Sequence, residues 1–488
     1  MSMAQFEKPE SVGSTPFALC EREYTFLPCL LCFTSPQIGF FLLFAPTTIL
    51  AGLYARHFGL SLTELAGVIF LARVFDAVTD PLVGYWSDRV RERTGSRKYF
   101  VLVGGLMLAP ISYFLYVPLG VQAGAEEGVS LFYFASLYIA FYWAFTLFQT
   151  PYLAWANEFT RNGPEKIQVF TIINIMGNLG TLLFYSAPFL PYFITTDITP
   201  EVLRLTTILG IPFFVIGLLA ALKYVPDGPV LNNVREEGVA FGQKLSEFYS
   251  NLLGNKPFLL YVTILIVAGT GAGLWVGLFF TFVDSYLQQG EVYAKISILA
   301  ILISFVAVPI WYKVVMQTGK RVTWLIVSSG QAIFFLSLGF LQPGVGQGLI
   351  IVLYIFYLSV SAAAGIIMGP ILCDIIDYGR LKKESANSGL MFALQGLLIK
   401  LPVAIGVALS LAITGWLGYD ATLVGEQTSS AEFGMRLGVS WLPAVFMFLS
   451  LLLIVRMPLS ECRMEIIRKR LVRRPGLANK VPIGKITD

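Results

Sequence analysis

Twelve apolar runs, each of roughly 20 residues or more, constrain the fold of this 488-residue chain more than any other feature. Charged residues make up 13% of the chain, about half the share of an ordinary soluble protein, while 56% of the residues are hydrophobic. A soluble globule of this size could not cover its surface with so few polar groups, and disorder requires the opposite composition. We therefore predict an all-α membrane protein with these transmembrane helices: 26–54, 60–86, 99–119, 130–156, 168–193, 203–225, 257–287, 293–316, 322–342, 347–373, 388–416 and 435–457.

The longest polar stretch between these runs divides them into two groups of six. This pattern predicts two pseudo-symmetric six-helix bundles that enclose a central site near the midplane of the membrane. The organisation that follows is a cytoplasmic N-terminal segment (1–25), an N-terminal bundle (26–225), a cytoplasmic central loop (226–256), a C-terminal bundle (257–457) and a basic cytoplasmic tail (458–488).

The basic residues predict the orientation of the chain. Of the 34 lysine and arginine residues, 28 lie in the N-terminal segment, in loops after even-numbered runs or in the C-terminal tail, and only four lie in loops after odd-numbered runs. Because basic loops remain in the cytoplasm, we predict a multi-pass protein of the cell membrane with both termini cytoplasmic. The basic tail is interpreted as a topology anchor, with contact to anionic lipid headgroups as the alternative.

The five cysteines and the single histidine exclude several kinds of site. His57 alone cannot form a histidine-based metal centre, and the odd, scattered cysteines argue against a disulfide framework. Cys29 and Cys32 have the spacing of a redox pair, but their position at the start of an apolar run favours packing in a helix. With no Cys/His pair and no nucleotide-binding loop, we expect no enzymatic activity and no cofactor other than a coupling cation.

The second apolar run contains Arg73, Asp76 and Asp80, which are costly to place at membrane depth. Their spacing of i, i+3 and i+7 puts them on one helix face, where two carboxylates and one guanidinium leave one excess negative charge. Such a face attracts Na⁺ or H⁺, and the Thr79 hydroxyl is a further oxygen near it. The alternative is a structural salt bridge, which a single Arg–Asp pair would satisfy. We predict a cation site with Asp76 and Asp80 as the metal ligands.

Two further charged residues fall within the runs. Lys400 lies deep in the eleventh run, and its predicted partner is Asp76 or Asp80 across the interface between the halves. In that position Lys400, together with Arg73, could couple cation binding to transport, and a static buried pair is the alternative. Asp284 is interpreted first as a helix-end residue and second as a contact for cargo.

Several motifs carry a resemblance to known transporters. Residues 84–89 (GYWSDR), followed by 95–98 (GSRK), resemble the loop between helices 2 and 3 of the major facilitator superfamily. Residues 72–81 (ARVFDAVTDP), 373–379 (CDIIDYG) and 149–152 (QTPY), together with Lys400, resemble the glycoside–pentoside–hexuronide:cation symporters, the melibiose permease group. The resemblance implies cation-coupled symport by alternating access, with the cation held by Asp76, Asp80, Thr79 and Thr146. It also implies a cytoplasmic gate, in which the glycine permits close helix packing and Asp88 pairs with arginines, formed by Gly84, Asp88, Arg89, Arg97, Asp374 and Asp377.

The positions at which that family recognises sugar are occupied differently in this chain. Gln149 stands in place of an aspartate, Leu153 in place of a tryptophan, and residues 172–177 contain no arginine. Because selectivity depends strongly on such buried hydrogen-bonding groups, the resemblance favours an amphipathic compound or an aromatic glycoside over a galactoside. The residues predicted to contact this cargo are Gln149, Tyr142, Tyr152, Trp155, Asn174 and Asn178.

The function predicted from the sequence is therefore symport of a small organic solute, coupled to Na⁺ or H⁺. A lipid or lysolipid transporter of the same fold and a proton-coupled exporter are the alternatives. We expect the solute, the cation and the lipid bilayer as partners, no nucleic acid, and a monomeric state.

Overall fold

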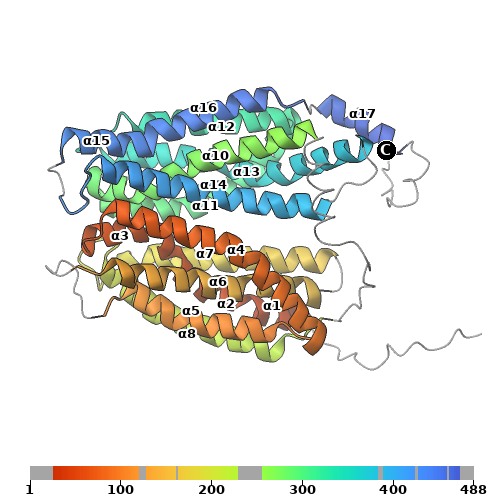
Figure 1. Ribbon diagram of the computed structural model, residues 1–488, viewed down its shortest axis with the longest axis horizontal. Coiled ribbons are helices and arrows are strands. Elements are labelled where there is room, and N and C mark those ends of the chain that lie inside the picture. The colour runs from red at the N-terminus through yellow and green to blue at the C-terminus, as the bar shows by residue number, and fades with distance from the viewer. Residues whose placement is uncertain are drawn as a thin grey trace, which may run out of the picture.

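The computed structural model describes residues 26–119, 128–160, 163–228, 255–382, 388–423, 427–458 and 461–472, and its regular structure there is entirely helical (Figure 1). The predicted N-terminal segment, most of the central loop and the end of the basic tail lie outside these residues.

Each of the twelve predicted runs coincides with one helix or with consecutive short helices. The first half consists of α1 (Phe26–Thr34), α2 (Pro36–Phe44), η1 (Ala45–Thr48), α3 (Leu50–His57), α4 (Leu62–Thr94), α5 (Lys98–Tyr116), α6 (Leu131–Phe159), α7 (Gly163–Ser186), η2 (Ala187–Phe189) and α8 (Pro200–Tyr224). The second half consists of α10 (Lys256–Thr281), η3 (Phe282–Tyr286), α11 (Gly290–Thr318), α12 (Lys320–Leu338), α13 (Gln347–Lys382), α14 (Ser388–Trp416), α15 (Ser429–Arg436), η4 (Leu437–Trp441) and α16 (Leu442–Val455), and α17 (Glu461–Val472) follows it.

Local sequence explains where several of these helices break or end. Pro36 and Pro46 each lie at the start of a new helical segment, which divides the first run into short pieces. Helix α4 begins with a capping box, in which Ser61 and Glu64 bond reciprocally, and it ends at Gly95, whose φ of 79° suits glycine.

Ten spans in the described residues are long and apolar enough to cross a membrane, and α11 would be an eleventh. Helix α11 is bent by 49° between Ile303 and Val306, as expected from Pro309, which removes a backbone hydrogen bond one turn earlier. Helix α4 does not satisfy this composition test, because three charged residues interrupt its apolar part. It nevertheless runs alongside the other helices (Figure 1). Of the twelve predicted spans, ten or eleven in the described residues are thus identified by length and apolar composition alone.

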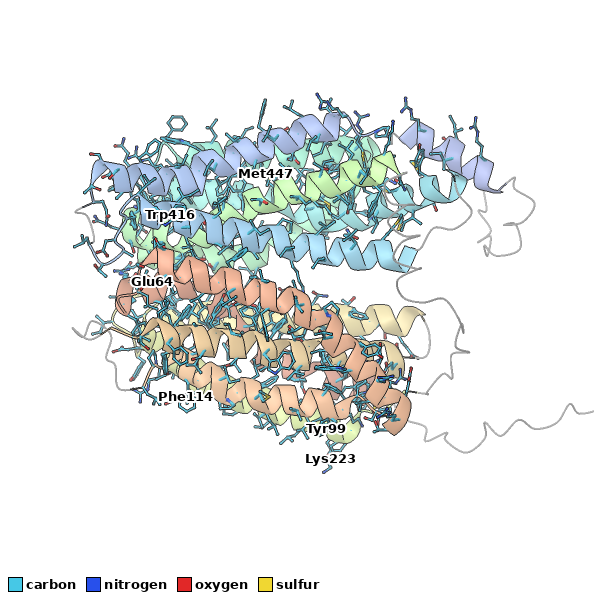
Figure 2. All side chains as sticks on the ribbon, viewed as in Figure 1. Glu64, Tyr99, Phe114, Lys223, Trp416 and Met447 are labelled. Atoms are coloured by element: carbon cyan, nitrogen blue, oxygen red, sulfur yellow. The ribbon has the colours of Figure 1, made fainter. Side chains whose placement is uncertain are left out.

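The outer surface of both halves carries large apolar side chains, as a lipid-facing surface requires. Tyr99 and Phe114 project from the N-terminal half and Trp416 from the C-terminal half (Figure 2). Trp416 is 72% exposed and Tyr99 67% exposed. The fold is thus that of a polytopic membrane protein.

The two halves pack side by side, α1–α8 in one and α10–α16 in the other (Figure 1). They meet mainly where α4 contacts α14, with further contacts between α7 and α11 and between α3 and α10. Glycine allows two close approaches near the end where α3 lies: a Cβ on Gly52 would come within 2.7 Å of Thr281 Oγ1, and one on Gly415 would clash with Thr63. Toward the opposite end α4 and α14 diverge (Figure 1).

Candidate functional site

The Asp76 and Asp80 carboxylates of α4 converge on one hydroxyl of α6, that of Thr146. Thr146 Oγ1 lies 2.9 Å from Asp76 Oδ1 and 2.9 Å from Asp80 Oδ1. Thr146 and Asp76 are buried, and Asp80 is partly exposed. This cluster lies at the boundary between the two halves, because α4 also packs against α14.

Thr146 has one hydroxyl proton but two carboxylate neighbours, and this arrangement favours binding of a positive ion. A hydroxyl can donate one hydrogen bond, so it can serve only one of two ionised carboxylates at a time. The second close approach is favourable when one carboxyl holds a proton or when a cation lies among the three oxygens. These three oxygens, two from carboxylates and one from a hydroxyl, are suited to bind a hard cation or a proton.

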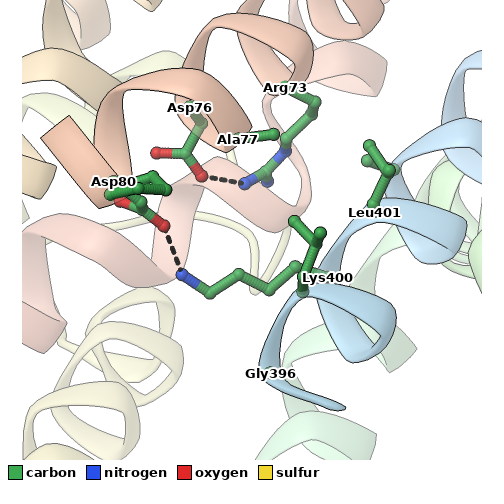
Figure 3. Close-up of a pocket in the computed structure, with 10 residues that line it drawn as sticks. Arg73, Asp76, Ala77, Asp80, Gly396, Lys400 and Leu401 are labelled. Atoms are coloured by element: carbon green, nitrogen blue, oxygen red, sulfur yellow. Dashed lines mark hydrogen bonds and ion pairs between the residues drawn. The ribbon is translucent and has the colours of Figure 1, made fainter. Parts of the chain in front are cut away.

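Lys400 brings a cation to the same site from the other half. Its Nζ donates a hydrogen bond to Asp80 Oδ2 at 2.9 Å, and the pair joins α14 to α4 (Figure 3). The Lys400 side chain is 58% exposed and borders a cavity of about 240 Å³ that Asp76, Asp80 and Arg73 also line. The Lys400 ammonium can therefore leave Asp80 without crossing packed protein.

Arg73 belongs to the same cluster but is turned toward α6. Its Nη2 donates a hydrogen bond to Tyr142 Oη at 2.7 Å, while its Nη1 stays 4.0 Å from Asp76 Oδ2. The guanidinium also lies over the Tyr142 ring, 4.2 Å from the centroid. Asp76 is thus not hydrogen-bonded to the arginine that the sequence places one turn away.

Thr79 is buried on α4, but its hydroxyl donates to the Asp76 carbonyl at 3.3 Å and it does not line the cavity. In this conformation Thr146, rather than Thr79, provides the hydroxyl oxygen next to the carboxylates. No group of three or more His, Cys, Asp or Glu residues suited to a metal ion occurs in the described part of the chain. A cation at Asp76 and Asp80 would consequently rely on two carboxylates and a hydroxyl.

A second cavity, of about 270 Å³, lies between α2, α6 and α7. Gln149, Asn174 and Asn178 line it together with apolar residues. Gln149 Oε1 is buried and accepts no hydrogen bond from the described residues, whereas Asn174 donates to the Phe170 carbonyl at 2.7 Å. Since Gln149 follows Thr146 by three residues on α6, this cavity begins one helical turn from the cation site.

The three aromatic residues predicted to contact cargo are all buried within the N-terminal half. Tyr142 bonds to Arg73, Tyr152 donates to the Phe33 carbonyl, and Trp155 donates to the Pro226 carbonyl at 3.0 Å. Their polar atoms are committed to these partners, and none of the three lines the second cavity. In this conformation their rings pack rather than face a cavity.

Two of the four predicted gate residues of the first half, Asp88 and Arg97, belong to one network at the ends of α4 and α6. Arg97 is buried and donates hydrogen bonds to Asp88, to Ser87 at 2.7 Å and to Glu158 at 2.7 Å. Arg91 also pairs with Glu158. Glu158 was not among the predicted gate residues, and its signal in the sequence is an acid just past the end of the fourth run. Burial raises the pKa of the Glu158 carboxyl, and the two arginines oppose that rise.

The remaining gate residues are less tightly packed or lie elsewhere. Gly84 does not mark a close helix approach, since a Cβ there would meet nothing nearer than Thr150 Cγ2 at 3.9 Å. Arg89 lies over the Tyr85 ring, 5.4 Å from its centroid. In the second half, Lys320 pairs with Asp374, and Asp377 lies one turn further along α13.

A second ion pair joins the halves at the end where α3 lies. Arg56 at the end of α3 pairs with Asp284, which sits in the π-helical turn η3 that follows α10. The Asp197 carboxylate also lies near this ion pair. Gly290 leaves room for it, since a Cβ at that position would touch the carboxylates of both Asp197 and Asp284. Burial and the neighbouring Asp284 carboxylate raise the pKa of Asp197.

We expect that Arg56→Gln will loosen this end of the molecule, because it leaves the Asp284 carboxylate buried without its partner. The measurement is the rate at which a membrane-impermeant maleimide labels a cysteine introduced at Ser297, a buried position on α11. We expect an increase of about tenfold, as for a shift of roughly 1.4 kcal/mol. The charge-reversed double variant Arg56→Asp/Asp284→Arg should restore slow labelling. Equal rates in the wild type, the single variant and the double variant would contradict a role of this ion pair in holding the two halves together.

Comparisons with known proteins show the family and the fold of the chain. Residues 32–461 match the model of a family described as MFS/sugar transport protein. A putative glycoside/cation symporter of Escherichia coli, YagG, is 22% identical over 437 residues, which cover 87% of this chain and 90% of that protein. A sodium-dependent lysophosphatidylcholine symporter of Danio rerio is 24% identical over 451 residues, 83% of this chain and 80% of that protein. The nucleoside transporter NupG has the same fold, with a TM-score of 0.61, 13% identity, and coverage of 88% of this chain and all of that structure.

Proposed function

Since the chain belongs to the MFS/sugar transport protein family, we propose that it is a secondary active transporter that couples the entry of Na⁺ or H⁺ to symport of a small organic solute. One observation carries the proposal: Thr146 joins two carboxylates of one half, and Lys400 of the other half bonds to one of them. Similarity to symporters of glycosides and of lysophosphatidylcholine supports it.

In this mechanism the coupling cation competes with Lys400 for Asp80. A cation that enters the cavity neutralises Asp76 and Asp80, and the ammonium group is released from the interface. Thr146 lies on the same helix as Gln149, one turn away. Neutralisation of the carboxylates bonded to Thr146 therefore affects the part of α6 that lines the second cavity. Cation binding thereby raises the affinity for solute, and the two halves rock around the loaded site.

We propose that the second cavity receives the solute. Its amides can bond to the hydroxyls of a glycoside, and its apolar residues Phe41, Leu153, Phe170 and Ile173 can pack on an apolar group. An amphipathic or aromatic glycoside has both features. Lysolipid transport is the second candidate, because these apolar residues outnumber the amides and the Danio rerio relative is a lysophosphatidylcholine symporter.

We propose the cell membrane as the location, both termini in the cytoplasm, a monomeric state and no cofactor beyond the cation. The start of α10, the end of α8 and helix α17 all lie at the same end of the bundle (Figure 1). With that end cytoplasmic, the Arg56–Asp284 pair closes the outer face and the conformation faces inward.

We expect Gln149→Leu to raise the KM for solute about tenfold, because it removes the amide whose carbonyl has no hydrogen-bond partner among the described residues. The assay is Na⁺- or H⁺-gradient-driven uptake into proteoliposomes, with an aryl glycoside and lysophosphatidylcholine as separate solutes. Gln168→Leu, an exposed position on α7, is the matched control. If a cation gradient drives uptake of neither solute, the proposed cargo classes are wrong, and gradient-driven export would instead favour an exporter.

A further inference from the structure

The buried hydroxyl of Tyr142 accepts a hydrogen bond from Arg73, a residue beside the proposed cation site. We propose that Tyr142 is a positioning residue that keeps the Arg73 guanidinium beyond hydrogen-bond distance of Asp76, in a long ion pair of 4.0 Å, and so sets the affinity of the site for its cation. The inference rests on the proposed cation site at Asp76 and Asp80, and it assigns Tyr142 a role other than contact with cargo.

Two hydroxyls of α6 hold Arg73 apart from Asp76 and Asp80 of α4. Tyr142 and Thr146 are four residues apart and therefore lie on the same face of α6, one turn from each other. Tyr142 accepts the hydrogen bond from Arg73, and Thr146 contacts Asp76 and Asp80. The positive charge of Arg73 is thus held at one hydroxyl, and the negative charges of Asp76 and Asp80 lie at the next.

The distances show that this separation depends on Tyr142. Arg73 Nη2 is 2.7 Å from Tyr142 Oη, whereas Arg73 Nη1 is 4.0 Å from Asp76 Oδ2, outside hydrogen-bond range. Arg73 and Asp76 are on adjacent turns of α4, so a small rotation of the arginine side chain would close the gap. A partly buried guanidinium that loses one acceptor favours another, and the Asp76 carboxylate, 4.0 Å away on the same helix, is a charged acceptor within its reach.

The Tyr142 side chain is built into the helix bundle and can hold a fixed position. It is 1% exposed, and its ring packs against Tyr138 with centroids 5.1 Å apart and against Phe141 at 5.7 Å. The ring also lies beneath the guanidinium, 4.2 Å from the central carbon of Arg73. A residue so confined is available to position Arg73 but presents no open face to a solute.

The direction of the effect follows from charge. With Arg73 held at Tyr142, Asp76 keeps its negative charge for the cation. If the guanidinium hydrogen-bonded to Asp76, it would neutralise that carboxylate and compete with the cation, as Lys400 competes at Asp80. Loss of the Tyr142 hydroxyl therefore lowers cation affinity, although that hydroxyl is not itself a ligand.

The test is Tyr142→Phe, which keeps the ring and removes only the acceptor. Cation affinity is measured from the rise in melting temperature of purified protein as Na⁺, Li⁺ or H⁺ is titrated at constant ionic strength. We expect the dissociation constant of the stabilising cation to rise about fivefold, the change that one hydrogen bond makes. Tyr116→Phe, a buried tyrosine that donates to the Leu43 carbonyl at 2.7 Å, is the matched control and should leave the constant unchanged.

A double-mutant cycle separates positioning from packing. In an Arg73→Gln background there is no guanidinium to hold, so Tyr142→Phe should have no further effect on cation affinity. An equal loss of affinity in both backgrounds, or no loss in either, overturns the role of Tyr142 while leaving the cation site intact. If no cation stabilises the wild-type protein, the proposed cation site fails and this inference fails with it.

Discussion

Asp80→Asn is expected to abolish the stabilisation that the coupling cation gives to the purified protein. Asp80 provides one of the two charges of the site and is bonded both to Thr146 and to Lys400. Loss of a supporting residue around a metal site costs about 10–100-fold in affinity, so loss of a charged ligand should cost at least about 100-fold. The measurement is the melting temperature in Na⁺ against choline at equal ionic strength, repeated across pH so that a proton site is also detected.

The matched control for this experiment is Glu92→Gln. Glu92 is an exposed acid on the same helix, more than three turns from Asp80, and its replacement removes the same charge by the same chemistry. The control should retain the full cation response. Asp76→Asn should behave as Asp80→Asn does. If both aspartate variants kept the wild-type response, the cation would bind elsewhere.

Hydropathy was sufficient to predict the fold. The twelve apolar runs coincide with helices because a membrane-spanning segment must satisfy its own backbone hydrogen bonds, which ties apolar length to helix. The sequence did not predict the extension of α4 to Thr94 or of α13 to Lys382, since both helices continue past their apolar parts into polar sequence. Helix α4 was predicted as the run 60–86, although its charges, those of the proposed cation site among them, keep it from being identified as a span by composition alone.

Helical spacing was enough to predict the charged part of the proposed cation site, whereas Thr146 was indicated only by the resemblance to known symporters. Helical spacing alone puts Arg73, Asp76 and Asp80 on one face, whereas the contact with Thr146 depends on how α4 packs against α6. Likewise, periodicity could not indicate that the Thr79 hydroxyl bonds to its own helix. The pair of Arg56 with Asp284 depends on tertiary packing and leaves no local signal, whereas the pair of Lys400 with Asp80 was indicated by charges at membrane depth.

Lys400 gives the second large effect, opposite in sign to that of Asp80. Lys400→Gln is expected to raise cation affinity about tenfold, because it removes a competitor that donates directly to Asp80 at 2.9 Å. The gain is limited by the exposure of the Lys400 side chain, 58%, since solvent screens part of the attraction between the ammonium group and the carboxylate. Lys223→Gln, at an exposed lysine near the end of α8, is the matched control for loss of a positive charge.

The same substitution should separate exchange from net transport. A carrier that has released its cation and solute must return with Asp76 and Asp80 unneutralised unless another positive charge occupies the site, and Lys400 is placed to provide it. Without Lys400 the loaded carrier can still cross, so exchange of internal for external solute should persist. Net uptake driven by a cation gradient should fall at least about tenfold, because the empty carrier returns slowly. Loss of both activities with unchanged cation affinity would instead mean that Lys400 is a static structural partner of Asp80.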